Sequence, residues 1–298
     1  MNRAAVAVVL ALSAALATSN AQSQPAPAPT PAVTNVGANL NITPKRLTFD
    51  RARRSATVYI YNQGNQPATF DIALVDRVML QDGQIITVND ADAAAKPIVA
   101  QLKSAKDLLL VSPRRATLAP GQGQTIRLRI GSVPADAAGE YRTHLTVTTI
   151  PPPSAGVSAE AAAAGGRGEL SFQINAVFGI SIPAIVRFSD PDPRAAIENA
   201  HIEQVDMALD GKTTKRTPVM VFDLTRQGTS SLFGNIEVRG RNQKEALGFA
   251  RGLGVYTEIA KRTVRIPLTR EPGSGEKLEI TFTDDDTSPG KLLAKLDM

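Results

Sequence analysis

Residues 170–182 alternate between apolar and polar or small side chains almost without a break. The apolar positions are Leu170, Phe172, Ile174, Ala176, Phe178, Ile180 and Ile182, and Val177 departs from the pattern. A period of two is typical of a β-strand with one buried face, because successive side chains of a strand point to opposite sides. At about 3.3 Å per residue this strand would span roughly 40 Å, more than one small sandwich covers. We therefore expect it to run from one domain into the next.

The rest of the sequence consists of short apolar or alternating runs separated by turn signals. In the first half these runs lie at residues 41–49, 56–61, 69–79, 108–111, 125–130 and 142–150. In the second half they lie at residues 202–209, 218–225, 232–238, 254–259, 263–268 and 277–283. Turns rich in Gly, Pro, Asn and Asp stand between them, and no long amphipathic helix is present in the pattern. These features predict an all-β chain of antiparallel sandwiches, with a second sandwich of about 110 residues.

The N-terminal segment has the composition of an export signal. Arg3 precedes an apolar run at residues 4–16, and the small residues Ser19 and Ala21 stand where a signal peptidase reads. The run is about a dozen residues long, short of the roughly 20 that cross a bilayer. We expect a cleaved signal peptide at 1–21, with a retained anchor as the alternative, and a periplasmic mature protein without stable membrane insertion.

Proline and small residues mark the expected domain boundaries. Residues 22–38 alternate proline with alanine or threonine in their first part, which predicts a disordered leader. Residues 151–168 begin with three prolines and continue with Ala and Gly, which predicts a long loop. The expected domains are therefore a first sandwich at 39–182 that contains this loop, and a second sandwich at 183–298.

Composition excludes several kinds of chemistry. The chain has no cysteine, and therefore no disulfide, thiol nucleophile or thiolate metal site. Its two histidines, His144 and His201, accompany no Gly-x-Ser-x-Gly nucleophile elbow. Thirty-three Lys and Arg against 28 Asp and Glu give a net charge of +5, too small and dispersed to indicate nucleic-acid binding. We expect a protein that is not an enzyme and needs no cofactor or metal.

Two charged clusters have simple structural interpretations. Arg51, Arg53 and Arg54 follow a predicted strand without interleaved aromatic residues, which favours a solvated hairpin, with a partner-facing role as the alternative. The aspartates at 284–286 lack the spaced ligands and internal glycine of a calcium loop. A solvated turn is therefore expected there.

Three stretches of the first half resemble the periplasmic pilus-assembly (fimbrial) chaperones of the PapD-like family. The first is Arg46-Leu47-Thr48-Phe49-Asp50 with the strand at 56–61 and Asn62-Gln63-Gly64. The second, residues 111–127, is close to the family's Ser-Pro, Pro-Gly-Gln and Arg signature and is the most specific. The third joins the turn at 133–136 to the strand at 141–150 and Pro151-Pro152. The resemblance covers roughly residues 40–187 and indicates a divergent member.

The resemblance implies two Ig-like antiparallel β-sandwich domains in an L or boomerang arrangement. It also implies donor-strand complementation, in which the chaperone lends its last strand to an incomplete pilus subunit and delivers that subunit to an outer-membrane usher. Leu170, Phe172, Ile174 and Ala176 would be the subunit-binding side chains, with Arg46 gripping the subunit's terminal carboxylate. The alternative for these apolar residues is that they only face their own core. The same edge could also pair two copies of the chain.

The sequence departs from the family at the carboxylate clamp. Gly179 takes the place of the family's lysine in an ungapped alignment, and Arg187 or a cation of the second domain could substitute for it. The family's interdomain ion pair is also hard to place, since Pro183 stands where its arginine is expected. Gly179 and the Ala/Gly-rich loop keep a second function open, an exported Ig-like structural, adhesive or binding protein without chaperone activity. Enzymatic activity is the third alternative.

Overall fold

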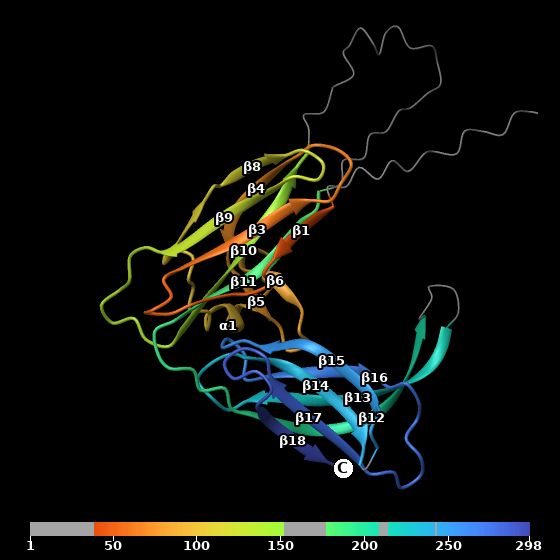
Figure 1. The fold of residues 1–298 in the computed structure, drawn as a ribbon. Coiled ribbons are helices and arrows are strands. Elements are labelled where there is room, and N and C mark those ends of the chain that lie inside the picture. The colour runs from red at the N-terminus through yellow and green to blue at the C-terminus, as the bar shows by residue number, and fades with distance from the viewer. Residues whose placement is uncertain (1–38, 152–176, 209–213, 242) are drawn as a thin grey trace, which may run out of the picture. The chain divides into compact units, whose positions relative to one another are not determined.

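The computed structural model describes residues 39–151, 177–208, 214–241 and 243–298. Almost all of the regular structure is β-strand, drawn in Figure 1. In the described residues the helices are the 3-10 turn η1 (Val88–Asp90) and the single-turn α1 (Lys96–Val99). In these same ranges, no helix is long and apolar enough to cross a lipid bilayer. The prediction of an all-β protein built from two sandwiches is confirmed, and the L or boomerang arrangement stays a prediction.

The first sandwich consists of two sheets. One sheet has the order β1-β3-β9-β7, with β1 (Leu40–Thr43), β3 (Ser55–Asn62), β9 (Gly123–Ile130) and β7 (Leu109–Ser112). The other has the order β2-β11-β10-β4-β8, with β2 (Leu47–Phe49), β11 (Gly179–Arg187), β10 (Glu140–Ile150), β4 (Ala68–Val75) and β8 (Arg115–Leu118). Alternate residues of these strands form one core, which includes the fully buried Ile42, Ile60, Phe70, Leu128 and Leu145.

The second sandwich also has two sheets. One has the order β12-β13-β16, with β12 (Ala195–Ala208), β13 (Thr214–Arg226) and β16 (Lys261–Pro267). The other has the order β15-β14-β17-β18, with β15 (Ala246–Val255), β14 (Leu232–Gly240), β17 (Leu278–Asp284) and β18 (Leu292–Asp297). Its core includes Met220, Phe222, Val238, Ile280 and Phe282. A small hairpin of β5 (Arg77–Met79) and β6 (Ile85–Thr87) contributes Met79 to this second core.

Two runs that the sequence suggested as single strands are each divided between sheets. Residues 41–49 give β1, which pairs with β3, and β2, which pairs in parallel with β11. Pro44 lies between the two, and a proline has no N–H with which to continue a ladder. Residues 69–79 likewise give β4 and β5 in different sheets. The alternating pattern is the same in both sheets, so it does not reveal the change of partner.

The strand predicted at 170–182 is described only in its last part, where β11 runs from Gly179 to Arg187. The expected boundary between residues 182 and 183 falls inside this strand, where Pro183 lies opposite His144 of β10. The period-two pattern explains the extension, because Ile182, Ala184 and Val186 all enter the first core. Ile185, on the other face, belongs to the second core.

Candidate functional site

The predicted subunit-binding residues differ in what the structure says of them. Leu170, Phe172, Ile174 and Ala176 lie outside the described residues, as does the loop predicted after Pro151. Arg46 is described and lies directly before β2. Gly179 begins β11 opposite Thr148 of β10. The candidate site is therefore built from Arg46 and the described end of the strand that follows the predicted donor segment.

Arg46 is largely buried, with 12% of its side chain exposed. Its Nη2 donates to Asp286 Oδ2 at 3.1 Å and lies 3.5 Å from Ser231 Oγ. Its guanidinium carbon is 4.5 Å from the centre of the Phe233 ring, within the range of a cation–π contact. The guanidinium is thus held by one carboxylate and one aromatic face.

Arg187, the last residue of β11, reaches the same carboxylate. Its Nη2 donates to Asp286 Oδ2 at 2.5 Å, and its Nε donates to Glu140 Oε2 at 2.9 Å. Glu140 begins β10 and is directly opposite Arg187 in the ladder. Two guanidinium groups therefore converge on one oxygen atom of Asp286, and the structure places Arg187 beside Arg46. We call Arg46, Arg187, Glu140 and Asp286 the two-arginine cluster.

The charges of this cluster stabilise one another. Burial alone would raise the pKa of Asp286, but Arg46 and Arg187 outweigh it and lower this pKa. Burial alone would lower the pKa of Arg187, but Glu140 and Asp286 outweigh it and raise that pKa. Both shifts favour the charged forms of Asp286 and Arg187.

The hydrogen-bonding capacity of the two-arginine cluster is not filled. In the described part of the chain, Arg46 Nε, Arg46 Nη1 and Glu140 Oε1 are buried without a hydrogen-bond partner. A pocket opens beside the cluster, lined in part by Thr48, Arg53, Phe188 and the two cluster residues Arg187 and Asp286. The two unused donors are on Arg46, which shares Asp286 with this pocket without lining it, and a further anion would need donors of this kind.

The first part of β11 presents an open sheet edge. β10 pairs with the whole of β11, whereas β2 pairs only with Ala184, Ile185 and Val186. Within the described ranges, residues 179–183 therefore have a neighbouring strand on one side only. Val177 and Phe178, immediately before this edge, are 57% and 49% exposed. An edge with exposed apolar side chains is a template for adding another strand.

The sequence interpretation missed the role of the aspartates at 284–286. Asp284 is buried and accepts hydrogen bonds from the backbone N–H of Asp286 and of Ser288 and from the Thr287 hydroxyl. This side chain fixes the turn that carries Asp286 to the two arginines. The expectation of a solvated turn is wrong here, and the hydroxyl residues after the aspartates were the signal of a side-chain-capped turn. Arg51 is also not fully solvated, since its guanidinium lies 5.7 Å from the Phe188 ring centre.

A second buried ion cluster surrounds Arg142 of β10. Arg142 donates to Glu258 Oε1, to the carbonyl of Arg77 at 2.9 Å and to the ring of His144. Its guanidinium carbon lies 3.9 Å from the centre of the Tyr256 ring. The Arg142 and Glu258 side chains are 1% and 0% exposed. Burial, then Arg142 and two further arginines, lower the pKa of His144 to about 2. We call Arg142, Glu258, His144 and Tyr256 the closed cluster.

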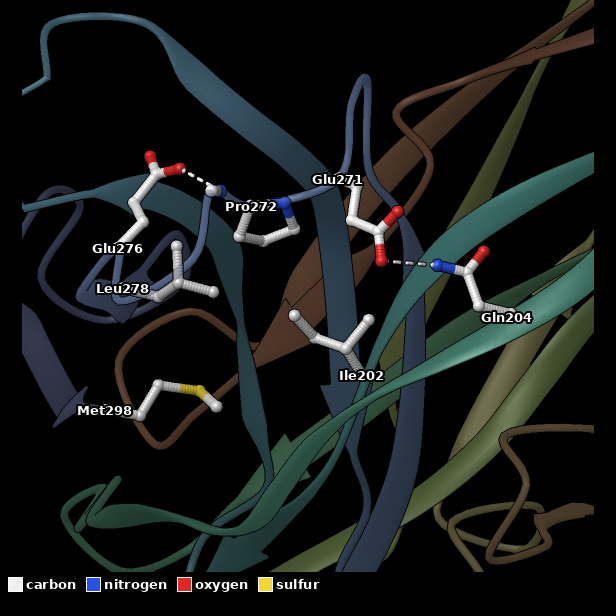
Figure 2. A pocket seen from close by; sticks show the side chains of 8 residues that line it. Ile202, Gln204, Glu271, Pro272, Glu276, Leu278 and Met298 are labelled. Carbon is white, nitrogen blue, oxygen red and sulfur yellow. Dashed lines mark hydrogen bonds between the residues drawn. The ribbon is translucent and has the colours of Figure 1, made fainter.

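The second sandwich has a pocket of its own, shown in Figure 2. Ile202, Leu278 and Met298 supply its apolar part, and Gln204 Nε2 donates to Glu271 Oε1 at 3.1 Å. Glu276 accepts from the Gly273 N–H at 2.7 Å, and Arg270 binds the same carboxylate. Arg270 and this N–H lower the pKa of Glu276 to about 2. A carboxylate held so firmly in its ionised form is poorly suited to general acid or base catalysis.

Comparison with known proteins gives similarity in solved structures only. No protein-family model and no curated protein matches the chain. The YadV chaperone has 11% identity and a TM-score of 0.44, over 87% of this chain and 98% of that one. The CupB2 chaperone of Pseudomonas aeruginosa has 12% identity and a TM-score of 0.42, over 86% and 98%. The CsuC–CsuE chaperone–tip subunit complex from Csu pili of Acinetobacter baumannii has 15% identity and a TM-score of 0.42, over 87% and 98%. Likeness at this level assigns neither family nor function.

Proposed function

We propose that this protein is a periplasmic chaperone of the PapD-like type that binds pilus or fimbrial subunits by donor-strand complementation. The observation that carries the proposal is the course of β11. Its first residues form an open edge, and its last residue is Arg187, beside Arg46. One strand therefore joins an edge that can accept a partner strand to a buried site that can accept a carboxylate.

The open edge supplies the first half of the mechanism. A client that lacks one strand adds to this edge through backbone hydrogen bonds, and every second side chain of the donor fills the client's groove. Leu170, Phe172 and Ile174 have the spacing for this role, with Ala176 as a smaller fourth contact. Each large side chain is worth roughly 1.5–3 kcal/mol when fully buried, so three supply about 5–9 kcal/mol before ordering costs.

The two-arginine cluster supplies the second half. A guanidinium stays charged and binds a carboxylate through two parallel hydrogen bonds. Arg46 has two buried donors without a partner in the described residues, which can receive the C-terminal carboxylate of the client. In this proposal Arg187 supplies the positive charge that the family's lysine would supply at the position of Gly179. Asp286 positions both arginines. When the client's terminal carboxylate binds, Asp286 either keeps its hydrogen bonds to the arginines or is replaced by that carboxylate.

The experiment is native co-purification from the periplasm with mass spectrometry of the proteins that accompany the chaperone. Wild type is compared with Phe172→Asp and with a matched control, Ser171→Asp, which puts the same charge on the neighbouring, opposite-facing position of the strand. We expect a small secreted β-rich subunit with wild type and with Ser171→Asp. It should be lost with Phe172→Asp, because a charge cannot enter an apolar groove.

Arg46→Ala and Arg46→Lys test the carboxylate half in the same assay. We expect a strong loss of the subunit with Arg46→Ala and partial recovery with Arg46→Lys, since lysine keeps the charge but not the bidentate geometry. Equal recovery of the subunit by wild type, Phe172→Asp and Arg46→Ala would refute the mechanism. Purification of a client-free oligomer would favour instead the self-associating Ig-like protein, with pairing through the same β11 edge. Delivery to an outer-membrane usher is a further part of the proposal.

A further inference from the structure

The outer face of the sheet β1-β3-β9-β7 carries two tyrosines side by side. Tyr59 and Tyr61 project from the same face of β3, with ring centres 6.5 Å apart and ring planes inclined by only 26°. Tyr59 is 44% exposed, which is unusual for a large aromatic side chain on a small domain. The two rings together form a nearly continuous aromatic surface in contact with solvent.

One glycine allows the Tyr59 ring to lie close to the sheet. A Cβ atom at Gly123 of β9 would stand 2.1 Å from the Tyr59 hydroxyl oxygen, so the Tyr59 ring occupies the space that any other residue would need. A Cβ atom at Gly121 would stand 3.6 Å from the Tyr61 hydroxyl, which is an ordinary contact distance. The tyrosines therefore extend across the neighbouring strand instead of standing away from it, and present ring faces to a ligand.

Two arginines continue this surface along β9. Arg127 and Arg129 are exposed and follow Thr125, which lies opposite Tyr59. Tyr59 and Arg129 are thus separated by roughly 13 Å along the strand, at about 3.3 Å per residue. The strands β1, β3, β7 and β9 contain no Asp or Glu. In the described part of the chain neither arginine forms an ion pair or a side-chain hydrogen bond.

Small hydroxyl side chains flank Arg127 on both sides and Arg129 on one, the other neighbour of Arg129 being the exposed Leu110 of β7. Arg127 lies between Thr57 of β3 and Ser112 of β7, and Arg129 lies opposite Ser55. Hydroxyl groups of this kind both donate and accept hydrogen bonds. The face therefore combines an aromatic platform, unpaired cations and a set of short polar groups, within one rigid sheet.

We propose that this face binds an anionic polysaccharide. The apolar faces of sugar rings stack on flat aromatic rings, the arginines bind carboxylate groups in the bidentate manner, and the hydroxyl side chains bond to sugar hydroxyls. A duplex nucleic acid, with one charge per about 1.7 Å, would call for more cations over this length than two arginines, and a single strand, whose bases can stack on the rings, is an outcome of the test below. An acidic peptide such as polyglutamate has no sugar rings to stack on two ring faces exposed side by side. The site lies in the sheet opposite β11, and so it does not depend on the proposed chaperone function.

Affinity electrophoresis of the full mature chain in native gels tests the proposal. The probes are polygalacturonate as the anionic polysaccharide, dextran as the neutral one, polyglutamate as the acidic peptide and poly(dT) as the nucleic acid. We expect retardation by polygalacturonate that weakens with added salt, and little retardation by the other three. Absence of retardation by polygalacturonate overturns the proposal. Equal or stronger retardation by polyglutamate or poly(dT) also overturns it and identifies the face as a general acidic-ligand surface.

Variants separate the ring platform from the charge. Tyr59→Ala and the double variant Arg127→Ala/Arg129→Ala should each weaken binding at least tenfold, while Tyr59→Phe keeps the ring and should bind nearly as wild type. Arg115→Ala and Phe249→Ala are matched controls, because both side chains are exposed and lie on other faces of the molecule. They should bind as wild type. If the controls weaken binding as much as Tyr59→Ala does, the polysaccharide binds through nonspecific electrostatic or hydrophobic contacts. The assigned face is then wrong.

Discussion

The two-arginine cluster and the closed cluster are both buried groups of charges, yet they differ in what they leave unused. Arg142 and Glu258 are almost fully buried, and Tyr256 covers the guanidinium. Arg46 and Asp286 are each about one tenth exposed, at 12% and 10%, and Asp286 and Arg187 line a pocket. In the described residues the closed cluster leaves Arg142 Nε and Glu258 Oε2 without a hydrogen-bond partner, and the two-arginine cluster leaves Arg46 Nε, Arg46 Nη1 and Glu140 Oε1, so the clearer difference is the pocket beside the second. The closed cluster is therefore a structural element, and the two-arginine cluster has room for a ligand.

This difference bears on how buried ion pairs are interpreted. A buried pair is a poor indicator of net stability, because desolvation of both charges opposes their attraction. A charge cluster that binds a ligand needs a path for the ligand and polar atoms without a hydrogen-bond partner. A purely structural cluster needs neither. Both clusters contain an arginine beside an aromatic ring, so residue types alone do not separate them. The following substitutions test whether the separation holds.

Removal of the negative charge in the closed cluster should have the largest effect. Glu258→Gln keeps the size of the side chain but leaves Arg142 as an unpaired buried cation. Breaking a buried pair in this way typically costs about 3–5 kcal/mol. Urea unfolding at pH 7 measures the free energy directly.

The control for Glu258→Gln is the double variant Arg142→Met/Glu258→Met. Replacing both charges with apolar side chains of similar length removes the desolvation cost together with the attraction, and is often neutral. We expect it to recover only part of the lost stability, because the buried Met79 N–H donates to Glu258 Oε1 and loses this acceptor. If Glu258→Gln costs less than about 1 kcal/mol, water reaches this site and the cluster is not closed.

His144 should make the closed cluster sensitive to acid. Its pKa is about 2 in the folded protein, against about 6.5 in an unfolded chain. Above pH 6.5 the ring is neutral in both states and has no effect. Below that pH only the unfolded chain takes up the proton, so stability falls by about 1.4 kcal/mol per pH unit, or about 2 kcal/mol by pH 5.

The measurement is urea unfolding between pH 7.5 and pH 5 for wild type and His144→Gln, which should show a flatter profile. His201→Gln is the matched control with the opposite sign. The carbonyl of Asn199 and the carboxylate of Glu203 raise the pKa of His201, so its protonation favours the folded state. An equally steep loss of stability in His144→Gln and wild type would mean that another group is responsible.

The fold was largely predictable because alternation is a local property. Nearly every apolar run became a strand, and the pattern at Ile180 and Ile182 extended through Ala184 and Val186 into the same core. The pairing partners were not predictable, since a strand such as 41–49 keeps its period of two while it changes sheets. That change depends on Pro44 and on contacts with residues more than 100 positions away, at Ala184 to Val186.

The sequence named Arg46 and, as one of two possible substitutes for the missing lysine, Arg187, but it did not name their shared partner Asp286. An ungapped alignment pointed to Gly179 and Pro183, whereas the charge in the structure lies at Arg187, at the very end of β11. Asp286 comes from a distant turn whose shape depends on the buried Asp284. Convergence of two arginines on one oxygen is a tertiary property, and no spacing in the sequence encodes it. The open edge at 179–183 likewise depends on how far β2 extends.

The smallest effect is expected for Asp286→Asn, the counterpart of Glu258→Gln in the two-arginine cluster. Arg187 keeps Glu140, and Arg46 keeps the ring of Phe233 and its contact with Ser231 Oγ, so the cost at pH 7 should be about 1 kcal/mol. The sign with pH follows from the lowered pKa of Asp286. The stabilisation by the Asp286 carboxylate is fully present above the pKa of an unfolded aspartate, about 3.9. It is lost as the pH falls through the lower pKa of Asp286 in the folded protein. Wild type and variant should therefore converge below about pH 4.

Formate provides the second measurement on Asp286→Asn, because it is the smallest carboxylate and can restore the negative charge that the substitution removes. A ligand that binds only the folded state raises the unfolding midpoint, and its stabilisation grows as RT ln(1 + L/Kd), where L is the free ligand concentration. We expect formate, compared with chloride at equal ionic strength, to stabilise Asp286→Asn more than wild type, and to leave Glu258→Gln unaffected because no solvent path leads to Arg142. If formate stabilises both variants equally, the two clusters are equally accessible. This result would contradict the assignment of the two-arginine cluster as the carboxylate-binding site.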